Sequence, residues 1–210
     1  NRIMQVCRVA GLVALVRQLQ SPVVRGLRPL VVDAMTTNET QWFRDIYPFR
    51  VLGESVLPEL ARRAGARLRV WSAACSTGQE AYSISMAVEE FQARNPGALR
   101  AAVEIVGTDL SADVVARART GVYDDMAIAR GLPEERRERY FERVDGGWRV
   151  RAPLRARTTF REMNLLDSYA LLGRFDIIFC RNVLIYFDRE RKVDILSRMA
   201  KVMNPEGYLF

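Results

Sequence analysis

The 210-residue chain is 49% hydrophobic and 27% charged, a balance typical of one globular core with room for a small satellite domain. It has no histidine, and its three cysteines (Cys7, Cys75 and Cys180) lie far apart. A histidine-based triad, a histidine general base and the usual zinc sites are therefore excluded, and we expect no metal site. The formal net charge of +7 favours an acidic partner, whether nucleic acid, an anionic membrane or an acidic protein surface.

Residues 1–36 are predicted to form short helices and to make up a partial helical N-terminal domain. The apolar run Val9–Val16 is too short to span a bilayer, so no membrane insertion is expected. A signal peptide remains an alternative, but no small-residue cleavage site is obvious after the run. We interpret the run as a helix face, because valines at 6, 9, 13 and 16 recur at helical spacing. Ser21-Pro22 is typical of the end of one helix and the start of the next.

The next segment, TTNETQWFRD (Thr36 to Asp45), predicts a capped amphipathic helix. Asn38 and Gln41 have the spacing of a capping box. Thr40 and Arg44, four residues apart, would share one face of that helix.

From residue 66 onward, strand and helix patterns alternate, which indicates an α/β fold with a parallel sheet and right-handed crossovers. The expected strands are Arg67–Ala74, Ala101–Asp109 and Phe175–Cys180, and the expected helices are Gly78–Arg94, Ser111–Gly121 and Asp188–Gly207. Asp188 would cap the last helix, and Asn204-Pro205 would end it. The final NPEGYLF has the pattern of a turn entering a strand, so we expect a sheet truncated at its carboxyl end.

A segment at about residues 122–160 breaks the alternation. It contains the charged run ERRERYFERV and the pattern FERVDGGWRVR, which predicts a hairpin around Asp145-Gly146-Gly147. We expect a small β-subdomain inserted into the domain.

Polar residues stand at three expected strand ends, where open α/β sheets bind ligands. Asp109 could accept hydrogen bonds from ribose hydroxyls, or it could cap the following helix. In AACSTGQEA, Gly78 could let a ligand approach the backbone or serve a tight turn, and Glu80 could simply complement the helix dipole. Arg181 and Asn182 follow the third strand; the structural alternatives are an Arg181–Asp176 ion pair and a turn at Asn182.

Taken together, five motifs resemble the CheR family, the chemotaxis receptor glutamate methyltransferases, in order and spacing. They are TTNETQWFRD, VWSAACSTGQEAYSISM, TDLS, NLLD and FDIIFCRNVLIYF, and the resemblance covers about Gly26 to Phe210. It implies a Rossmann-like S-adenosylmethionine-dependent methyltransferase domain over residues 37–210. Where the family often has GEEPYS, this chain has GQEAYS, which alters one charge and the stiffness of the turn but keeps Glu80.

The resemblance also implies the site. Cofactor-binding residues would be Asn38, Thr40, Arg44, Glu80, Asp109, Asn164, Leu165, Arg181 and Asn182. Asp109 would hold the ribose hydroxyls, Asn164 and Leu165 would flank the adenine, and Glu80 would lie near the methionine end. Arg44 and Tyr186 would be nearest to the transferred methyl group and are the expected catalytic residues.

The implied reaction is methyl transfer from S-adenosylmethionine to receptor glutamates on acidic coiled-coil helices, which leaves S-adenosylhomocysteine as product. A glutamate carboxylate is already ionised at neutral pH, so no general base is required and the lack of histidine is consistent with this chemistry. We expect a cytoplasmic protein, because scattered cysteines fit a reducing compartment, and we expect it to be a monomer. Arginines 2, 8, 17, 25 and 28 could steer the acidic substrate, or they could form an ordinary solvated face.

Two other classes remain open. A methyltransferase acting on RNA or a small molecule would agree with the basic charge, although no nucleic-acid motif is present. A module that binds cofactor or receptor without turnover is the non-enzyme alternative.

Overall fold

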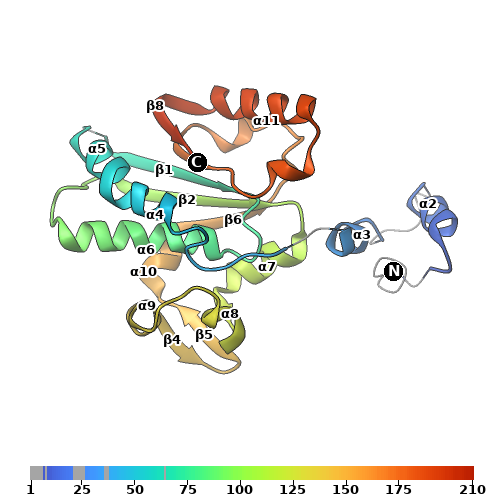
Figure 1. Ribbon diagram of the computed structural model, residues 1–210, viewed down its shortest axis with the longest axis horizontal. Helices are drawn as coiled ribbons and strands as arrows, with labels where there is room; N and C mark the ends of the chain where they lie inside the picture. The colour runs from blue at the N-terminus through green and yellow to red at the C-terminus, as the bar shows by residue number, and fades with distance from the viewer. Residues whose placement is uncertain (1–6, 8, 21–26, 36–37, 64) are drawn as a thin grey trace.

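The computed structural model describes residues 7, 9–20, 27–35, 38–63 and 65–210, with the backbone alone at residues 28 and 29 (Figure 1). Its main element is a five-stranded sheet in the order β6-β2-β1-β7-β8, and every neighbouring pair is parallel. The strands are β1 (Arg67–Ala73), β2 (Ala102–Asp109), β6 (Thr158–Glu162), β7 (Phe175–Phe179) and β8 (Met203–Leu209). The chain runs from β1 outward to β6 and then returns to β7, so the topological switch point lies beside β1.

Helices cover both faces of this sheet. One face carries α4 (Tyr47–Val51), the π-helix η1 (Leu52–Val56), α5 (Leu57–Arg62), α6 (Gln79–Arg94) and α7 (Ala112–Thr120); α11 (Arg189–Lys201) and the short η2 (Ala170–Leu172) lie on the other. In Figure 1, α11 lies above the sheet and α6 below it. The alternation along β1 explains the division, because Val70 packs toward α6 and Trp71 toward α11. The predicted α/β fold is therefore confirmed.

Local caps place the helix ends as the sequence predicted. The Ser111 hydroxyl accepts from the backbone N–H of Val114, and Gly121 ends α7 with a positive φ of 62°. The Asp188 carboxylate accepts from the N–H of Arg191 at the start of α11.

Two predicted helices are wrong in part. Residues 38–45 form an extended segment and a turn, and Phe43, Asp45 and Ile46 have positive φ values of 49°, 65° and 48°. Tertiary bonds override the capping-box pattern there, because Trp42 N–H donates to the Arg130 carbonyl and Phe43 N–H to the Ser83 hydroxyl.

The last helix ends at Lys201, and Asn204-Pro205 lies inside β8. The Val202 carbonyl accepts from the Phe175 N–H of β7, so the chain leaves the helix where it joins the sheet.

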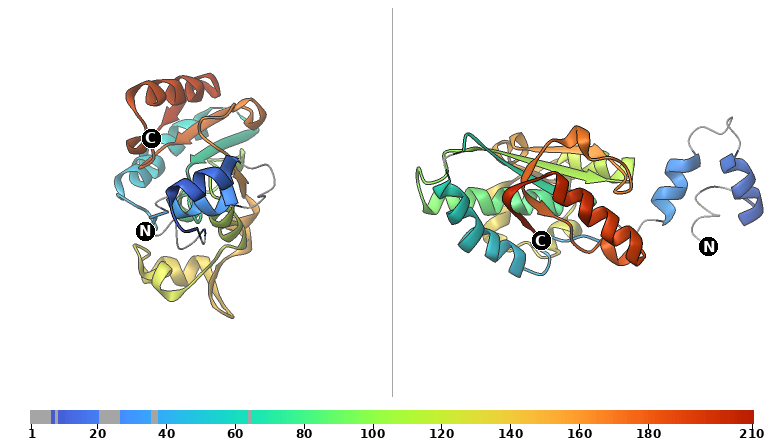
Figure 2. Two further views of the ribbon diagram at one scale, coloured as in Figure 1. Left: turned by 90° about the vertical axis from the view of Figure 1, so that its right-hand side faces the viewer. Right: turned by 90° about the horizontal axis from the view of Figure 1, so that it is seen from above.

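In the N-terminal part, the described helices are α2 (Leu12–Gln20) and α3 (Leu27–Met35), which lie to one side of the sheet (Figure 2). The predicted valine face is wrong at Val13 and Val16. Val13 and Val16 are 68% and 49% exposed, whereas Leu15 is buried with Cys7, Val9 and Leu27 in a small separate cluster. Val6 and Ser21-Pro22 lie outside the described residues.

A second sheet has the order β3-β5-β4 and consists of β3 (Val122–Tyr123), β4 (Phe141–Val144) and β5 (Gly147–Val150). The antiparallel pairing of β4 and β5 confirms the predicted hairpin. Three short helices surround this sheet: α8 (Asp125–Ala129), α9 (Glu134–Tyr140) and α10 (Ala152–Ala156). The segment expected at about 122–160 overlaps β6, which starts at Thr158 and belongs to the main sheet. The boundaries of the domains remain a prediction.

Trp42 joins the second sheet to the rest of the chain. Its ring meets Tyr123 and Phe141 edge-on, at centroid distances of 4.8 and 5.2 Å, and its indole N–H donates to the Ala127 carbonyl. The segment that precedes α4 is thereby attached to the inserted sheet.

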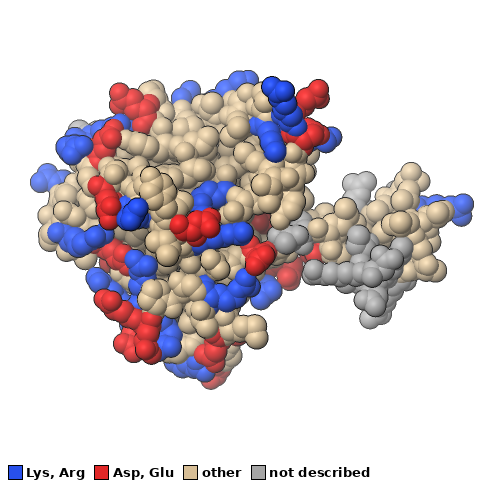
Figure 3. Space-filling model, in the orientation of Figure 1, with Lys and Arg blue, Asp and Glu red and all other residues tan. Residues whose placement is uncertain are grey.

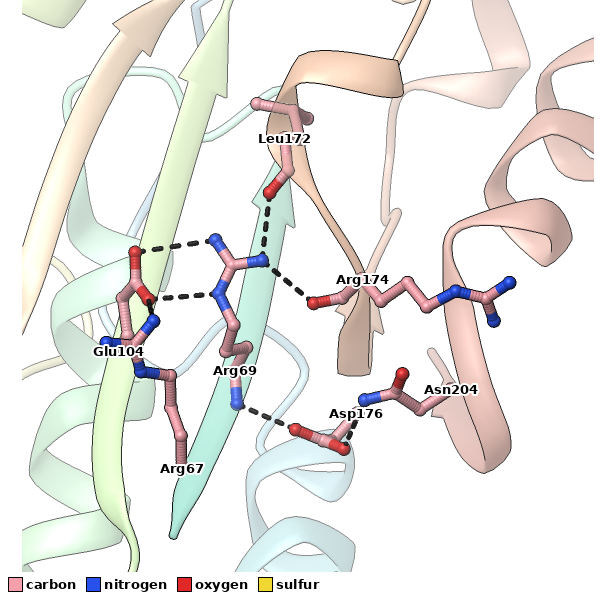
Figure 4. A network of polar contacts seen from close by, with 7 residues as sticks. All are labelled: Arg67, Arg69, Glu104, Leu172, Arg174, Asp176 and Asn204. Carbon is pink, nitrogen blue, oxygen red and sulfur yellow. Dashed lines mark hydrogen bonds and ion pairs between the residues drawn. The ribbon is translucent and has the colours of Figure 1, made fainter.

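Arg69 organises the amino edge of the main sheet (Figure 4). Its guanidinium donates to Glu104 at 2.9 Å and to the carbonyls of Leu172 and Arg174, both at 2.8 Å. Its backbone N–H donates to Asp176, which also accepts from the Asn204 amide. One side chain thus links β1, β2 and the segment that leads into β7.

We expect Arg69→Met to lower the free energy of unfolding by about 2 kcal/mol, because the partly buried Leu172 carbonyl, the Arg174 carbonyl and Glu104 lose a charged donor. Urea denaturation measures this change. Arg67→Met is the matched control on the same strand, since Arg67 is exposed and lies 3.7 Å from Glu104. An equal loss in the two variants would contradict the assignment.

The loss of stability caused by Arg69→Met should also depend on pH. The hydrogen bond from Arg69 holds the pKa of Glu104 below its ordinary value, against the opposing effect of burial. Glu104 therefore stabilises the fold fully above its unfolded pKa of about 4.3, and this contribution is lost as the pH falls through the lower folded pKa. The difference between wild type and Arg69→Met should narrow in acid.

Candidate active site

A cavity of about 420 Å³ opens at the carboxyl ends of β1, β2 and β7. All ten site residues expected from the sequence line it: Asn38, Thr40, Arg44, Glu80, Asp109, Asn164, Leu165, Arg181, Asn182 and Tyr186. Residues from five separate segments therefore meet at the switch point of the sheet, where ligands of open α/β folds bind.

The loop after β1 forms one wall of the cavity through Ala74, Cys75 and Ser76. Ala74 and Ser76 have positive φ values of 59° and 50°, a conformation that is costly for residues with a Cβ. Hydrogen bonds hold this loop. Ser76 N–H donates to Asp109 at 2.8 Å, and the Ser76 hydroxyl donates to the Asn38 carbonyl at 3.0 Å.

Gly78 does not have the ligand-approach role that we considered. It starts α6 with a φ of 94°, and a Cβ there would come within 3.0 to 3.2 Å of Ala118, Phe160 and Tyr123. The glycine therefore permits close packing of the turn against protein atoms, and the tight-turn alternative is the correct one.

Asp109 is 7% exposed at the end of β2. Its carboxylate accepts from the N–H groups of Ser76 and Ser111, one to each oxygen. Ser111, not Asp109, accepts the capping bond of α7. Burial raises the pKa of Asp109, and the backbone N–H bonds oppose that rise. A carboxylate has about four acceptor positions, so Asp109 keeps capacity for a hydroxyl donor from a ligand.

Arg181 is the most connected residue of the site, and its side chain is 9% exposed. It donates to Glu80 at 3.0 Å, to the Arg44 carbonyl at 2.7 Å and to Asp45 at 2.6 Å. The alternative Arg181–Asp176 ion pair is wrong, because Asp176 is bound by Arg69 and Asn204. Protein groups accept many of the hydrogen bonds that this guanidinium can donate. Its role is therefore to shape the wall of the cavity.

Glu80 receives the Ser72 hydroxyl at 2.7 Å on one oxygen and Arg181 on the other. Burial raises the pKa of this carboxyl, while the hydrogen bonds from Ser72 and Arg181 and the positive charges of Arg181 and Arg44 lower it in part. The residue is thus held by a charged pair inside the site, beyond the helix-dipole role considered from the sequence.

The other polar residues expected at the site come from three separate segments that line the cavity. Arg44 donates to the Glu39 carbonyl at 3.1 Å and leaves further donors for a ligand. Asn164 accepts from the N–H of Leu166 and so closes a tight turn. Asn182 has a φ of 57°, and Tyr186 in η3 (Leu184–Tyr186) is 61% exposed at the cavity.

Sequence reasoning missed the contribution of α3. Val32 and Met35 line the cavity, and Asp33 accepts a hydrogen bond from the Ser111 hydroxyl. Local periodicity gives no sign of this, because a helix pattern does not reveal which distant loop the helix covers. Leu110 and Met163 were also missed, although each is the chain neighbour of an expected residue.

The cysteines and the acidic side chains limit the chemistry of the site in two ways. Burial raises the pKa of Cys180 to about 12 and the pKa of Cys75 well above its ordinary value, so both thiols stay protonated at neutral pH. Among the described residues, no group of three or more cysteine, aspartate or glutamate side chains is placed to hold a metal ion.

Basic and acidic side chains are interspersed over the main part of the face drawn in Figure 3. Of the arginines considered for steering, only the side chain of Arg17 is described.

We expect Arg181→Met to lower the free energy of unfolding by about 3 kcal/mol, since it leaves the largely buried Glu80 side chain (15% exposed) without its charged partner. The double variant Arg181→Met with Glu80→Gln should recover part of the loss, because no unpaired charge remains. Chemical denaturation of the two single variants and the double variant measures the coupling. Strictly additive losses would show that the pair is not coupled.

Comparison with known proteins identifies the family. The family model described as "CheR methyltransferase, SAM binding domain" matches residues 38–210. The chain is 54% identical to chemotaxis protein methyltransferase Cher2 of Pseudomonas putida, with 100% of this chain and 77% of that protein covered. It is 51% identical to the chemotaxis protein methyltransferase of Vibrio parahaemolyticus, with 96% and 73% covered. The expected family and cofactor are confirmed: the chain is an S-adenosylmethionine-dependent methyltransferase and belongs to the CheR family.

Proposed function

We propose that this chain methylates glutamate side chains on the cytoplasmic helices of chemotaxis receptors, forming methyl esters that adapt the sensory response. The observation that carries the proposal is the convergence of all ten motif residues on one cavity. The names of the relatives, chemotaxis protein methyltransferases, support the pathway. The partners would be acidic coiled-coil receptor helices, and the chain would act as a cytoplasmic monomer.

The residues of the cavity fit S-adenosylmethionine chemically. Its volume of about 420 Å³ lies in the range of small-molecule sites. Asp109 has acceptor positions for ribose hydroxyls, and Leu110, Met163 and Leu165 offer apolar surface for an adenine ring. Glu80, Arg44 and Thr40 supply opposite charges and a hydroxyl for the amino-acid end. When bound, the cofactor supplies a methyl group made electrophilic by its sulfonium.

The substrate carboxylate needs no general base, since it is ionised at neutral pH. The task of the protein is to hold this nucleophile in line and to strip water from it. Arg44 and Tyr186 both line the cavity and can donate hydrogen bonds to a carboxylate. We assign them the orientation of the attacking oxygen. Among the described residues, the exposed Tyr186 hydroxyl makes no hydrogen bond that would give it another role.

Among the described residues, no helix is long and apolar enough to cross a membrane.

Tyr186→Phe should lower kcat about tenfold and change the Kd for S-adenosylhomocysteine little, because the lost donor would act on the substrate. Tyr47→Phe is the matched control, since Tyr47 is similarly exposed at 62% and does not line the cavity. Steady-state methyl transfer and calorimetry give the two quantities. A wild-type kcat for Tyr186→Phe would remove the tyrosine from this role.

The proposed function itself is tested with radiolabelled S-adenosylmethionine and receptor cytoplasmic fragments. We expect label in the receptor that is released by mild base, as a carboxyl methyl ester requires, and no label when the acceptor glutamates are replaced by alanine. Transfer to RNA in place of the receptor, or cofactor binding without any transfer, would overturn the proposal.

A further inference from the structure

Arg198 on α11 contacts the loop that lines the cavity, although no sequence motif includes it. Its guanidinium donates to the Leu165 carbonyl at 2.9 Å and to the Asp167 carbonyl. Asp194, one turn earlier on the same helix, accepts from Nε at 3.0 Å and from Nη2 at 2.7 Å. Asp194 thus orients the guanidinium, which ties α11 to the 164–167 loop.

Tyr169 donates a second hydrogen bond to the same carbonyl. Its hydroxyl lies 2.5 Å from the Leu165 oxygen, and its ring packs 4.7 Å from the Arg198 guanidinium. The ring is buried and meets Trp71 edge-on at 4.9 Å, and the Trp71 indole donates to Thr108. The two donors occupy both acceptor positions of the Leu165 carbonyl and anchor it to the core.

This double contact fixes the peptide group that joins Leu165 to Leu166, and bonds to Asn164 hold the preceding peptide group. The Asn164 carbonyl accepts from Asp167 N–H, and the Asn164 side-chain oxygen accepts from Leu166 N–H. Among the described residues, the Leu165 N–H and the Asn164 side-chain amide NH2 donate to no protein group. Both residues line the cavity, so these two donors are available to a ligand.

We infer that Arg198 and Tyr169 are positioning residues, which hold the 164–167 loop so that its free donors read the edge of the cofactor's base. The inference rests on the proposed placement of adenine beside Asn164 and Leu165. Adenine offers an acceptor nitrogen where hypoxanthine carries an N–H, so a rigidly held donor distinguishes the two bases. The Arg198–Asp194 pair alone would matter little, because surface ion pairs one turn apart are weak.

The test compares S-adenosylhomocysteine with S-inosylhomocysteine by calorimetry. For Arg198→Met we expect the Kd of S-adenosylhomocysteine to rise about tenfold and the preference for adenine over hypoxanthine to fall about fivefold. Arg198→Lys should restore part of the preference, since lysine retains a donor. Tyr169→Phe removes one bond and should have a smaller effect, about threefold on the same Kd. Because it preserves the buried ring, this variant tests the inference even if Arg198→Met folds poorly.

Arg191→Met is the matched control on the same helix, because Arg191 pairs only with exposed Asp188 at 2.8 Å among the described residues. It should leave both dissociation constants within about twofold of wild type. The inference is overturned if Arg198→Met and Tyr169→Phe keep the full preference for adenine, or if Arg191→Met loses it equally.

A wild-type chain that binds both analogues equally would also overturn the inference. Receptor methylation is measured separately with S-adenosylmethionine, so the proposed function would survive that result. Conversely, loss of receptor methylation with an intact preference for adenine would defeat the proposed function and leave the positioning role standing.

Discussion

The geometry of the site depends on the Arg181 guanidinium, which joins three segments that are distant in sequence. It follows β7, pairs with Glu80 in the first turn of α6, and binds the Arg44 carbonyl and the Asp45 carboxylate. Charged groups this well shielded from water require close partners, so the three segments are held in one arrangement. The strained turn at Phe43, Asp45 and Ile46 is tolerated because these contacts fix it.

The parallel sheet separates structural from ligand-facing polarity. At its amino edge, Arg69 gathers Glu104 and backbone carbonyls into a closed network, with Asp176 on its backbone N–H. At its carboxyl edge, Asp109 and Asn164 also bond to backbone groups, but both line the cavity and can make further hydrogen bonds to a ligand there. Because all five strands run in one direction, every loop that follows a strand reaches the same edge. That arrangement brings short, separate motifs into a single site.

Much of the fold and most of the candidate site were predictable. The strand and helix alternation gave the parallel sheet, and the motifs gave ten residues that do line one cavity. Predictions failed where a distant contact outweighed a local pattern. Residues 38–45 carry a capping box but bond to Arg130 and Ser83, so no helix forms there. At Gly78 the sequence left two roles open, and packing against Phe160 and Tyr123 decided for the tight turn.

The sequence by itself determined what depends on near neighbours. Ser111 and Asp188 cap helices within three residues of themselves, and alternating apolar residues assign the two faces of β1. Only the tertiary structure decided which partner Arg181 takes, that α11 ends at Lys201, and that Arg198 and Tyr169 converge on Leu165. These contacts join residues up to 137 positions apart, and no local periodicity encodes the partner of a buried charge.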